Sequence, residues 1–193
     1  NQRFILAGVL TGLAVATHHL SILALLVLLA ASTIKKEKKA SNDLTLGFLA
    51  VIVFVTAVFF IITHGEFIKQ VLLYHFQKPP EEVNKAASLI RFLNTNSILF
   101  AMAAIGILAR RRARLVVLSA AIVALYLFSF PIIKAAFNYY LIYAIPFLAV
   151  MAAYGLDSIY NFLMEKIRLT RAMSIILVIA IIFASAFPAT KQF

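Results

Sequence analysis

Long runs without a charged side chain dominate the pattern of polar and apolar positions along this chain. Stretches of at least 18 residues that contain no Asp, Glu, Lys or Arg occupy residues 4–34, 44–63, 92–109, 115–133, 135–156 and 172–190. A helix needs about 20 apolar residues to cross about 30 Å of hydrocarbon. The pattern therefore predicts an all-α, polytopic transmembrane bundle of about six to seven membrane helices.

Composition supports this class and excludes several others. Hydrophobic residues make up 64% of the chain and charged residues 13%, whereas a soluble domain carries about 25% charged residues. The absence of cysteine excludes disulfides and thiolate metal sites. We expect a single transmembrane domain over residues 1–193, and, because the chain begins without Met, a piece of a longer membrane protein.

The net charge of +11 predicts a membrane topology rather than a nucleic-acid partner. Clusters of Lys and Arg follow the first, third and fifth apolar stretches, and cytoplasmic loops carry such an excess. No basic stretch is interleaved with aromatic residues in a way that would stack bases. We therefore expect a multi-pass protein of the plasma membrane, with loops 35–43, 110–114 and 164–171 inside and loop 63–91 outside.

The first apolar stretch, residues 4–34, is too long for one ordinary span. Its 31 residues would form a helix of about 46 Å, and its centre reads Thr17-His18-His19. It is either one long tilted span with its N-terminus outside, or two short helices, 4–16 and 20–34, that meet at the histidines near the outer side. We favour the second arrangement, because it places Arg3 inside and lets the helix break line a wet pocket.

The outer loop 63–91 divides into two segments. Apolar positions with helical spacing between residues 66 and 77 predict a short amphipathic helix that lies in the membrane interface. Pro79-Pro80 would end this helix. Glu81 and Glu82 would then occupy the first turn of another short helix, where negative charge is favourable, leading to the third span.

Cationic and aromatic polar side chains gather on the predicted outer face, and this set suits an anionic lipid headgroup. Phosphate oxygens accept several charge-assisted hydrogen bonds, and apolar helices beside them would accommodate a lipid tail. An alternative is that these cations only contact ordinary lipid phosphates. The candidate residues for a polyprenyl-phosphate donor or substrate are His18, His19, His75, Lys78, Lys134 and Tyr139.

Other chemistry finds little support in the sequence. His64, Glu66 and His75 do not have an established zinc spacing, so we predict no metal site. No Ser-His-Asp arrangement and no glycine-rich phosphate loop is visible. No cofactor and no catalytic residue is therefore identified in this segment.

Three segments resemble the later membrane helices of the GT-C class of glycosyltransferases, notably the protein mannosyltransferase and lipid A aminoarabinose transferase families. The first is the small-residue helix with Gly-Leu-Ala that ends in Thr17-His18-His19. The second is the outer segment 74–80, which reads Tyr-His-Phe-Gln-Lys-Pro-Pro. The third is the run 134–149, which begins with Lys134 and continues into an apolar span with a proline.

The resemblance implies transfer of a sugar from a polyprenyl-phosphate donor to an acceptor on the outer face. His75, Lys134 and Tyr139 match the outer His, Lys and Tyr of the family pattern. His18 stands where the family usually has Lys, and Asn138 where it often has Arg, so two fixed positive charges are missing. The family's catalytic acid has no counterpart here, which implies the C-terminal part of the membrane domain with its catalytic residue elsewhere.

Two alternatives come from different functional classes. A transporter-like module for lipid-linked substrates needs ionisable residues inside the spans, and only His18 and His19 qualify. A non-catalytic membrane subunit would use Gly8 and Gly12, whose spacing suits close contact with other helices. The expected partners are membrane lipid, the lipid-linked donor, and the rest of a longer chain or a partner subunit, with no nucleic acid.

Overall fold

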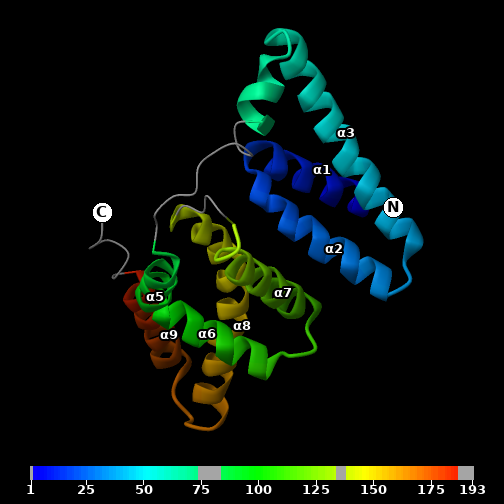
Figure 1. The fold of residues 1–193 in the computed structure, drawn as a ribbon. Helices are drawn as coiled ribbons and strands as arrows, with labels where there is room; N and C mark the ends of the chain where they lie inside the picture. Colours follow the sequence, from blue (N-terminus) through cyan, green and yellow to red (C-terminus); the bar gives the residue numbers. More distant parts are fainter. Residues whose placement is uncertain (1, 74–83, 134–137, 187–193) are drawn as a thin grey trace. The chain divides into compact units, whose positions relative to one another are not determined.

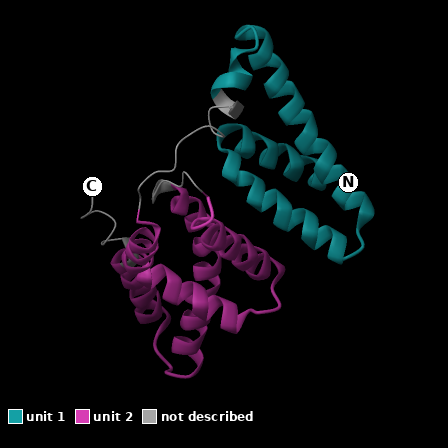
Figure 2. Ribbon diagram, in the orientation of Figure 1, with its two compact units in different colours: residues 1–82 teal, residues 83–193 magenta. Residues whose placement is uncertain are grey.

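The computed structural model of the 193-residue chain describes residues 2–73, 84–133 and 138–186 (Figure 1). The described residues form helices and the turns between them, and contain no β-strand. The predicted all-α class is thereby confirmed. The chain divides into two compact units, residues 1–82 and 83–193 (Figure 2). Each unit is described by itself, and the prediction of one domain stays a prediction.

The first unit contains a helical hairpin followed by a long helix. Its elements are α1 (Gln2–Thr17), a 3₁₀ turn η1 (His19–Ser21), α2 (Ile22–Ile34), α3 (Lys38–Ile62) and a π-helical segment η2 (Ile68–Leu73). His18 has an extended backbone, with φ −152° and ψ 112°, so the helix is broken there. The predicted division of the first apolar stretch into two short helices is confirmed.

Glycines bring α1 and α3 into backbone contact. A Cβ atom on Gly8 would overlap the carbonyl oxygen of Leu44, and one on Gly47 would overlap that of Ile5. Gly12, one turn beyond Gly8, meets the following turn of α3, so α1 and α3 run in the same direction. Helix α2, which lies between α1 and α3 in the sequence, runs in the opposite direction (Figure 1). Gly8 and Gly12 thus make a contact within the chain, and their predicted contact with helices of another subunit stays a prediction.

The described part of the second unit is also helical. Its elements are α5 (Lys85–Thr95), α6 (Ser97–Ala109), α7 (Arg114–Ser129), a 3₁₀ segment η3 (Asn138–Ala144), α8 (Ile145–Glu165) and α9 (Arg171–Ala186). Its core is centred on α7, η3 and α8, and the largest fully buried side chains of the described chain are Val116, Phe130, Leu141, Leu148, Met151 and Ser174.

Helices α6 and α8 cross at Gly106 and Gly155. A Cβ atom on Gly106 would overlap the carbonyl oxygen of Met151, and one on Gly155 would overlap that of Met102. Beyond this crossing, the Arg110 guanidinium pairs with the Asp157 carboxylate, with 3.2 Å between Nη2 and Oδ2. From the crossing to this ion pair, the contacts move toward the C-terminus of both helices, so α6 and α8 also run in the same direction.

The third apolar stretch, predicted as one span over 92–109, is broken in the structure. Helix α5 ends at Thr95, α6 begins at Ser97, and the two are bent by 75°. The Asn96 side chain donates to the carbonyl of Phe92 at 2.9 Å. Side-chain amides compete in this way with the helical hydrogen-bond ladder. A short helix leading to a separate span was predicted, but the predicted start of that span at residue 92 was wrong, because only charged residues were counted as interruptions.

The start of α5 also differs from the expectation. Asn84 is the N-cap, and its side chain accepts a 3.0 Å hydrogen bond from the backbone N–H of Ala87. The first turn of α5 therefore begins at Lys85 and contains no acidic residue. The expected glutamates, Glu81 and Glu82, and the pair Pro79-Pro80 lie outside the described residues.

Helix length identifies fewer candidate spans than the apolar stretches do. Within the described residues, α3 and the continuous helix Tyr140–Glu165 are long and apolar enough to cross a membrane. The bent pair of α5 and α6 becomes a third candidate if it forms one span. The other apolar helices have 10–17 residues. The predicted count of six to seven spans is therefore not confirmed by helix length.

We expect Gly106→Ala to destabilise the protein by about 1–3 kcal/mol. The new methyl group would meet the backbone of α8, which cannot move aside as a flexible side chain can. In a solvent-exposed helix, replacing Gly by Ala stabilises the protein by about 1 kcal/mol. A loss of stability would therefore show that Gly106 lies in a close helix crossing. Thermal unfolding in detergent micelles measures it. Ala104→Leu, at an exposed position of α6, is the matched control, and equal stability of Gly106→Ala and wild type would contradict the close contact.

Candidate functional site

Lys85 connects the end of the predicted outer loop to the segment that follows α7. Its ammonium donates to the carbonyl oxygen of Pro131 at 3.1 Å and also to that of Ile133. These carbonyls lie just beyond the C-terminus of α7, where the last turn leaves carbonyl groups without helical partners. A half-buried cation thereby anchors the chain directly before Lys134.

An aromatic cluster holds the other end of the same link. The ring of Tyr126 on α7 lies 6.4 Å from that of Tyr143 in η3 and 6.5 Å from that of Phe147 in α8. Tyr140 and Leu141 of η3 are buried. Because η3 is packed against both α7 and α8, the backbone position of Tyr139 within η3 is set by its neighbours.

The structure describes three of the six candidate residues. His18 and His19 are described with their side chains, and Tyr139 only by its backbone in η3. His75, Lys78 and Lys134 lie outside the described residues. The prediction that these side chains converge on a phosphate therefore stays a prediction.

The two histidines at the helix break stack on each other. Their ring centroids are 5.0 Å apart, with 15° between the ring planes. His18 is partly exposed and His19 is exposed, while Leu20 is buried against the unit. The break thus places two adjacent imidazoles at one end of the α1–α2 hairpin, and the Nδ1 atom of His18 is buried.

The turn after α3 starts the amphipathic helix that the outer loop was predicted to contain. His64 and Gly65 have positive φ angles of 49° and 86°, and the chain then becomes helical from Glu66 to Leu73. The Thr63 hydroxyl accepts a 3.0 Å hydrogen bond from the backbone N–H of Phe67. The start of the predicted helix is thus confirmed, and its end lies outside the described residues.

Charge in this segment is paired locally. The ammonium of Lys69 lies 2.8 Å from a carboxylate oxygen of Glu66. This hydrogen bond, together with the negative charge of Glu66, raises the pKa of the Lys69 ammonium above its ordinary value. Both groups are exposed, so the pair contributes little to stability. Among the described residues, no group of three or more His, Asp or Glu side chains is placed to hold a metal ion.

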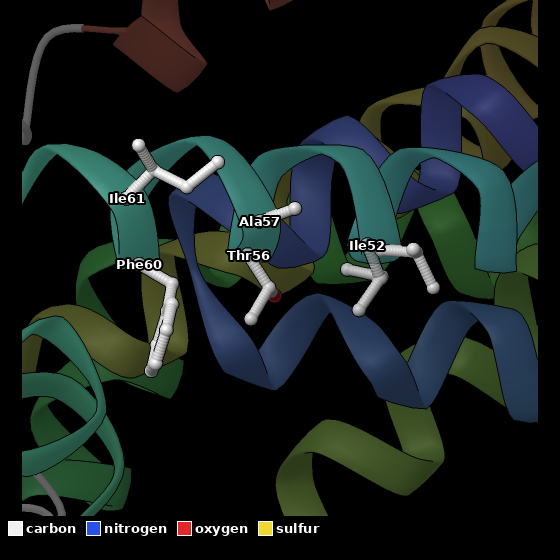
Figure 3. A pocket seen from close by; sticks show the side chains of 6 residues that line it. Ile52, Thr56, Ala57, Phe60 and Ile61 are labelled. Atoms are coloured by element: carbon white, nitrogen blue, oxygen red, sulfur yellow. The ribbon is translucent and has the colours of Figure 1, made fainter. Parts of the chain in front are cut away.

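A shallow groove of about 550 Å³ runs along one side of α3 (Figure 3). The residues that line it are Ile52, Val53, Thr56, Ala57, Phe60 and Ile61. Thr56 is the one polar residue among them, and its hydroxyl is the sole side-chain polar group at the groove. This surface suits hydrocarbon and offers no cation to a phosphate group.

The resemblance to the GT-C class stays a prediction, because no protein-family model, curated protein or solved structure matches this chain. Lys85 is the residue that sequence reasoning missed as a structural link. No local signal marks it, since its acceptors lie 46 and 48 residues further along the chain.

We expect Lys85→Met to loosen the segment after α7 and to lower stability by about 1–2 kcal/mol, because two hydrogen bonds from a half-buried cation are lost. Amide hydrogen exchange of Ile132 and Ile133 should become faster. Lys166→Met removes an exposed lysine from the turn after α8 and should change neither quantity. Unchanged exchange in Lys85→Met would show that the link does not depend on this lysine.

Proposed function

We propose that this chain is part of a membrane glycosyltransferase that moves a sugar from a polyprenyl-phosphate-linked donor to an acceptor on the extracytoplasmic face. One observation carries the proposal. The bonds from Lys85 to Pro131 and Ile133 join the end of the outer loop to the start of the link that bears Lys134 and Tyr139. Two segments predicted to face outward are thus held together, and one of them continues along the chain directly into Lys134.

In the proposed reaction the acceptor oxygen forms a bond to the sugar carbon while the bond from that carbon to the donor phosphate breaks. The polyprenyl phosphate leaves with the bonding electron pair, and an ionised carboxylate elsewhere in the enzyme acts as the base that takes the acceptor proton. Lys134, Lys78 and His75 would stabilise the negative charge that develops on the leaving phosphate. Lys85 is a positioning residue, because its ammonium is already bonded to backbone carbonyls.

In this proposal the charge-free stretches, apart from residues 92–95 in α5, lie within the membrane, which gives six to seven helices. The shorter ones, such as α1 with 16 residues, are accommodated by local thinning of the bilayer and by helix packing. Phe54 and Ile61 of α3 are 68% and 72% exposed, as expected of side chains that contact lipid. Helix α5, bent away from α6 and carrying exposed Ile90, would lie along the interface.

Accessibility of single cysteines tests the orientation. The chain has no native cysteine, so Glu37→Cys and Pro80→Cys each provide a unique thiol. A membrane-impermeant maleimide applied to intact cells should label position 80 and leave position 37 unlabelled until the cells are opened. Equal labelling of both positions in intact cells would contradict the proposed topology.

Binding of decaprenyl phosphate tests the proposed site. In the intact protein in detergent, Lys134→Ala and His75→Ala should each weaken binding about tenfold or more, because each removes a charge-assisted hydrogen bond. Native mass spectrometry measures the bound lipid, and decaprenol, which lacks the phosphate, measures the contribution of the tail. Lys36→Ala, in the predicted inner loop, is the control. Wild-type affinity in both test variants would remove the basis of the proposal.

A further inference from the structure

We propose that the turn between α6 and α7 is a binding site for the headgroup of an anionic phospholipid. A groove of about 550 Å³ opens at this turn. The residues that line it are Leu108, Ala109, Arg110, Arg111, Arg112 and Ala113. The inference depends on the proposed membrane location, but not on the proposed glycosyltransferase activity.

The backbone of the turn holds the arginines at its tip. The N–H of Arg110 donates to the carbonyl of Gly106 at 2.9 Å, and the N–H of Ala113 donates to the carbonyl of Arg110 at 2.8 Å. Helix α7 then begins at Arg114. The turn is closed by these backbone bonds, so Arg111 and Arg112 protrude from it, and both are exposed.

The arginines of the turn have two different roles. Arg110 pairs with Asp157 and thereby fastens the turn to α8. Within the described part of the chain, Arg111 and Arg112 have no carboxylate partner. A guanidinium group presents parallel N–H donors that match two phosphate oxygens. Two such groups beside one groove favour a phosphate ligand.

Exposed apolar side chains on both sides of the turn favour a lipid as the source of the proposed phosphate ligand. Leu108, before the turn, is 79% exposed, and Leu115, after it, is 59% exposed. A headgroup bound by the arginines would leave its acyl chains beside these leucines. A zwitterionic lipid has no net negative charge to offer, so the site should prefer phosphatidylglycerol to phosphatidylcholine.

Tryptophan reporters provide a local test, because the chain has no native tryptophan. Leu108→Trp places the indole at the groove. Ile34→Trp, at a position that is 81% exposed, places it beside the lysine-rich turn 35–39. The four lysines of that turn together with Glu37 have the same net charge as the four arginines at the turn between α6 and α7 together with Asp157, which pairs with Arg110. The second reporter therefore controls for unspecific attraction between basic turns and anionic lipid.

The reconstituted protein is titrated with dibrominated phosphatidylglycerol or dibrominated phosphatidylcholine, whose bromines quench a nearby indole. At Leu108→Trp the apparent affinity for phosphatidylglycerol should exceed that for phosphatidylcholine at least about fivefold. Adding Arg111→Gln and Arg112→Gln should reduce this ratio to about one, with unchanged helical circular dichroism. The ratio at Ile34→Trp should be clearly smaller than at Leu108→Trp.

Equal ratios at the two reporters, or a ratio that survives loss of both arginines, would overturn the proposed lipid site while leaving the membrane location intact. Absence of quenching by either lipid at both positions would overturn the membrane location and the site with it. Addition of inorganic phosphate at millimolar concentration should not displace the brominated lipid. Displacement would identify a general anion site in place of a lipid site.

Discussion

Backbone contact between helices that run in the same direction is the constraint on which each unit of this structure depends. In the first unit Gly8 and Gly47 allow the contact, and in the second Gly106 and Gly155 allow it. In lipid the hydrophobic effect does not drive helices together, so close packing of small residues and polar contacts must do so. In the proposed membrane location the apolar surface elsewhere, such as the groove along α3, would contact lipid.

The second unit has two polar links in addition to its glycine crossing, one from Arg110 and one from Lys85. Arg110 and Asp157 pair at the ends of α6 and α8 that the charge pattern predicts to lie inside. Lys85 binds the carbonyls after α7 on the side predicted to face outward. The apolar helices therefore carry few polar links, and those links lie where water or lipid headgroups can solvate them.

Part of this fold follows from the sequence by simple physical reasoning. The break at His18 was predicted, because two histidines in the middle of an overlong apolar stretch are costly in a continuous span. The bend at Asn96 was not predicted, because an uncharged amide interrupts a helix through hydrogen bonding rather than charge. The link from Lys85 was not predictable either, since its acceptors are backbone carbonyls far along the chain. Of the candidate site, the sequence predicts residue types, whereas convergence of His75 and Lys134 depends on loops outside the described residues.

The order of the helices also has a consequence for biosynthesis. All residues of the crossing between α1 and α3 precede Thr63, so the first unit can complete its closest contact before the second has left the ribosome. That contact joins the first and third helices, so in the proposed membrane location the nascent chain would keep α1 beside the insertion machinery until α3 emerges. A substitution of Gly8 or Gly47 would then delay the release of the first helices into the bilayer.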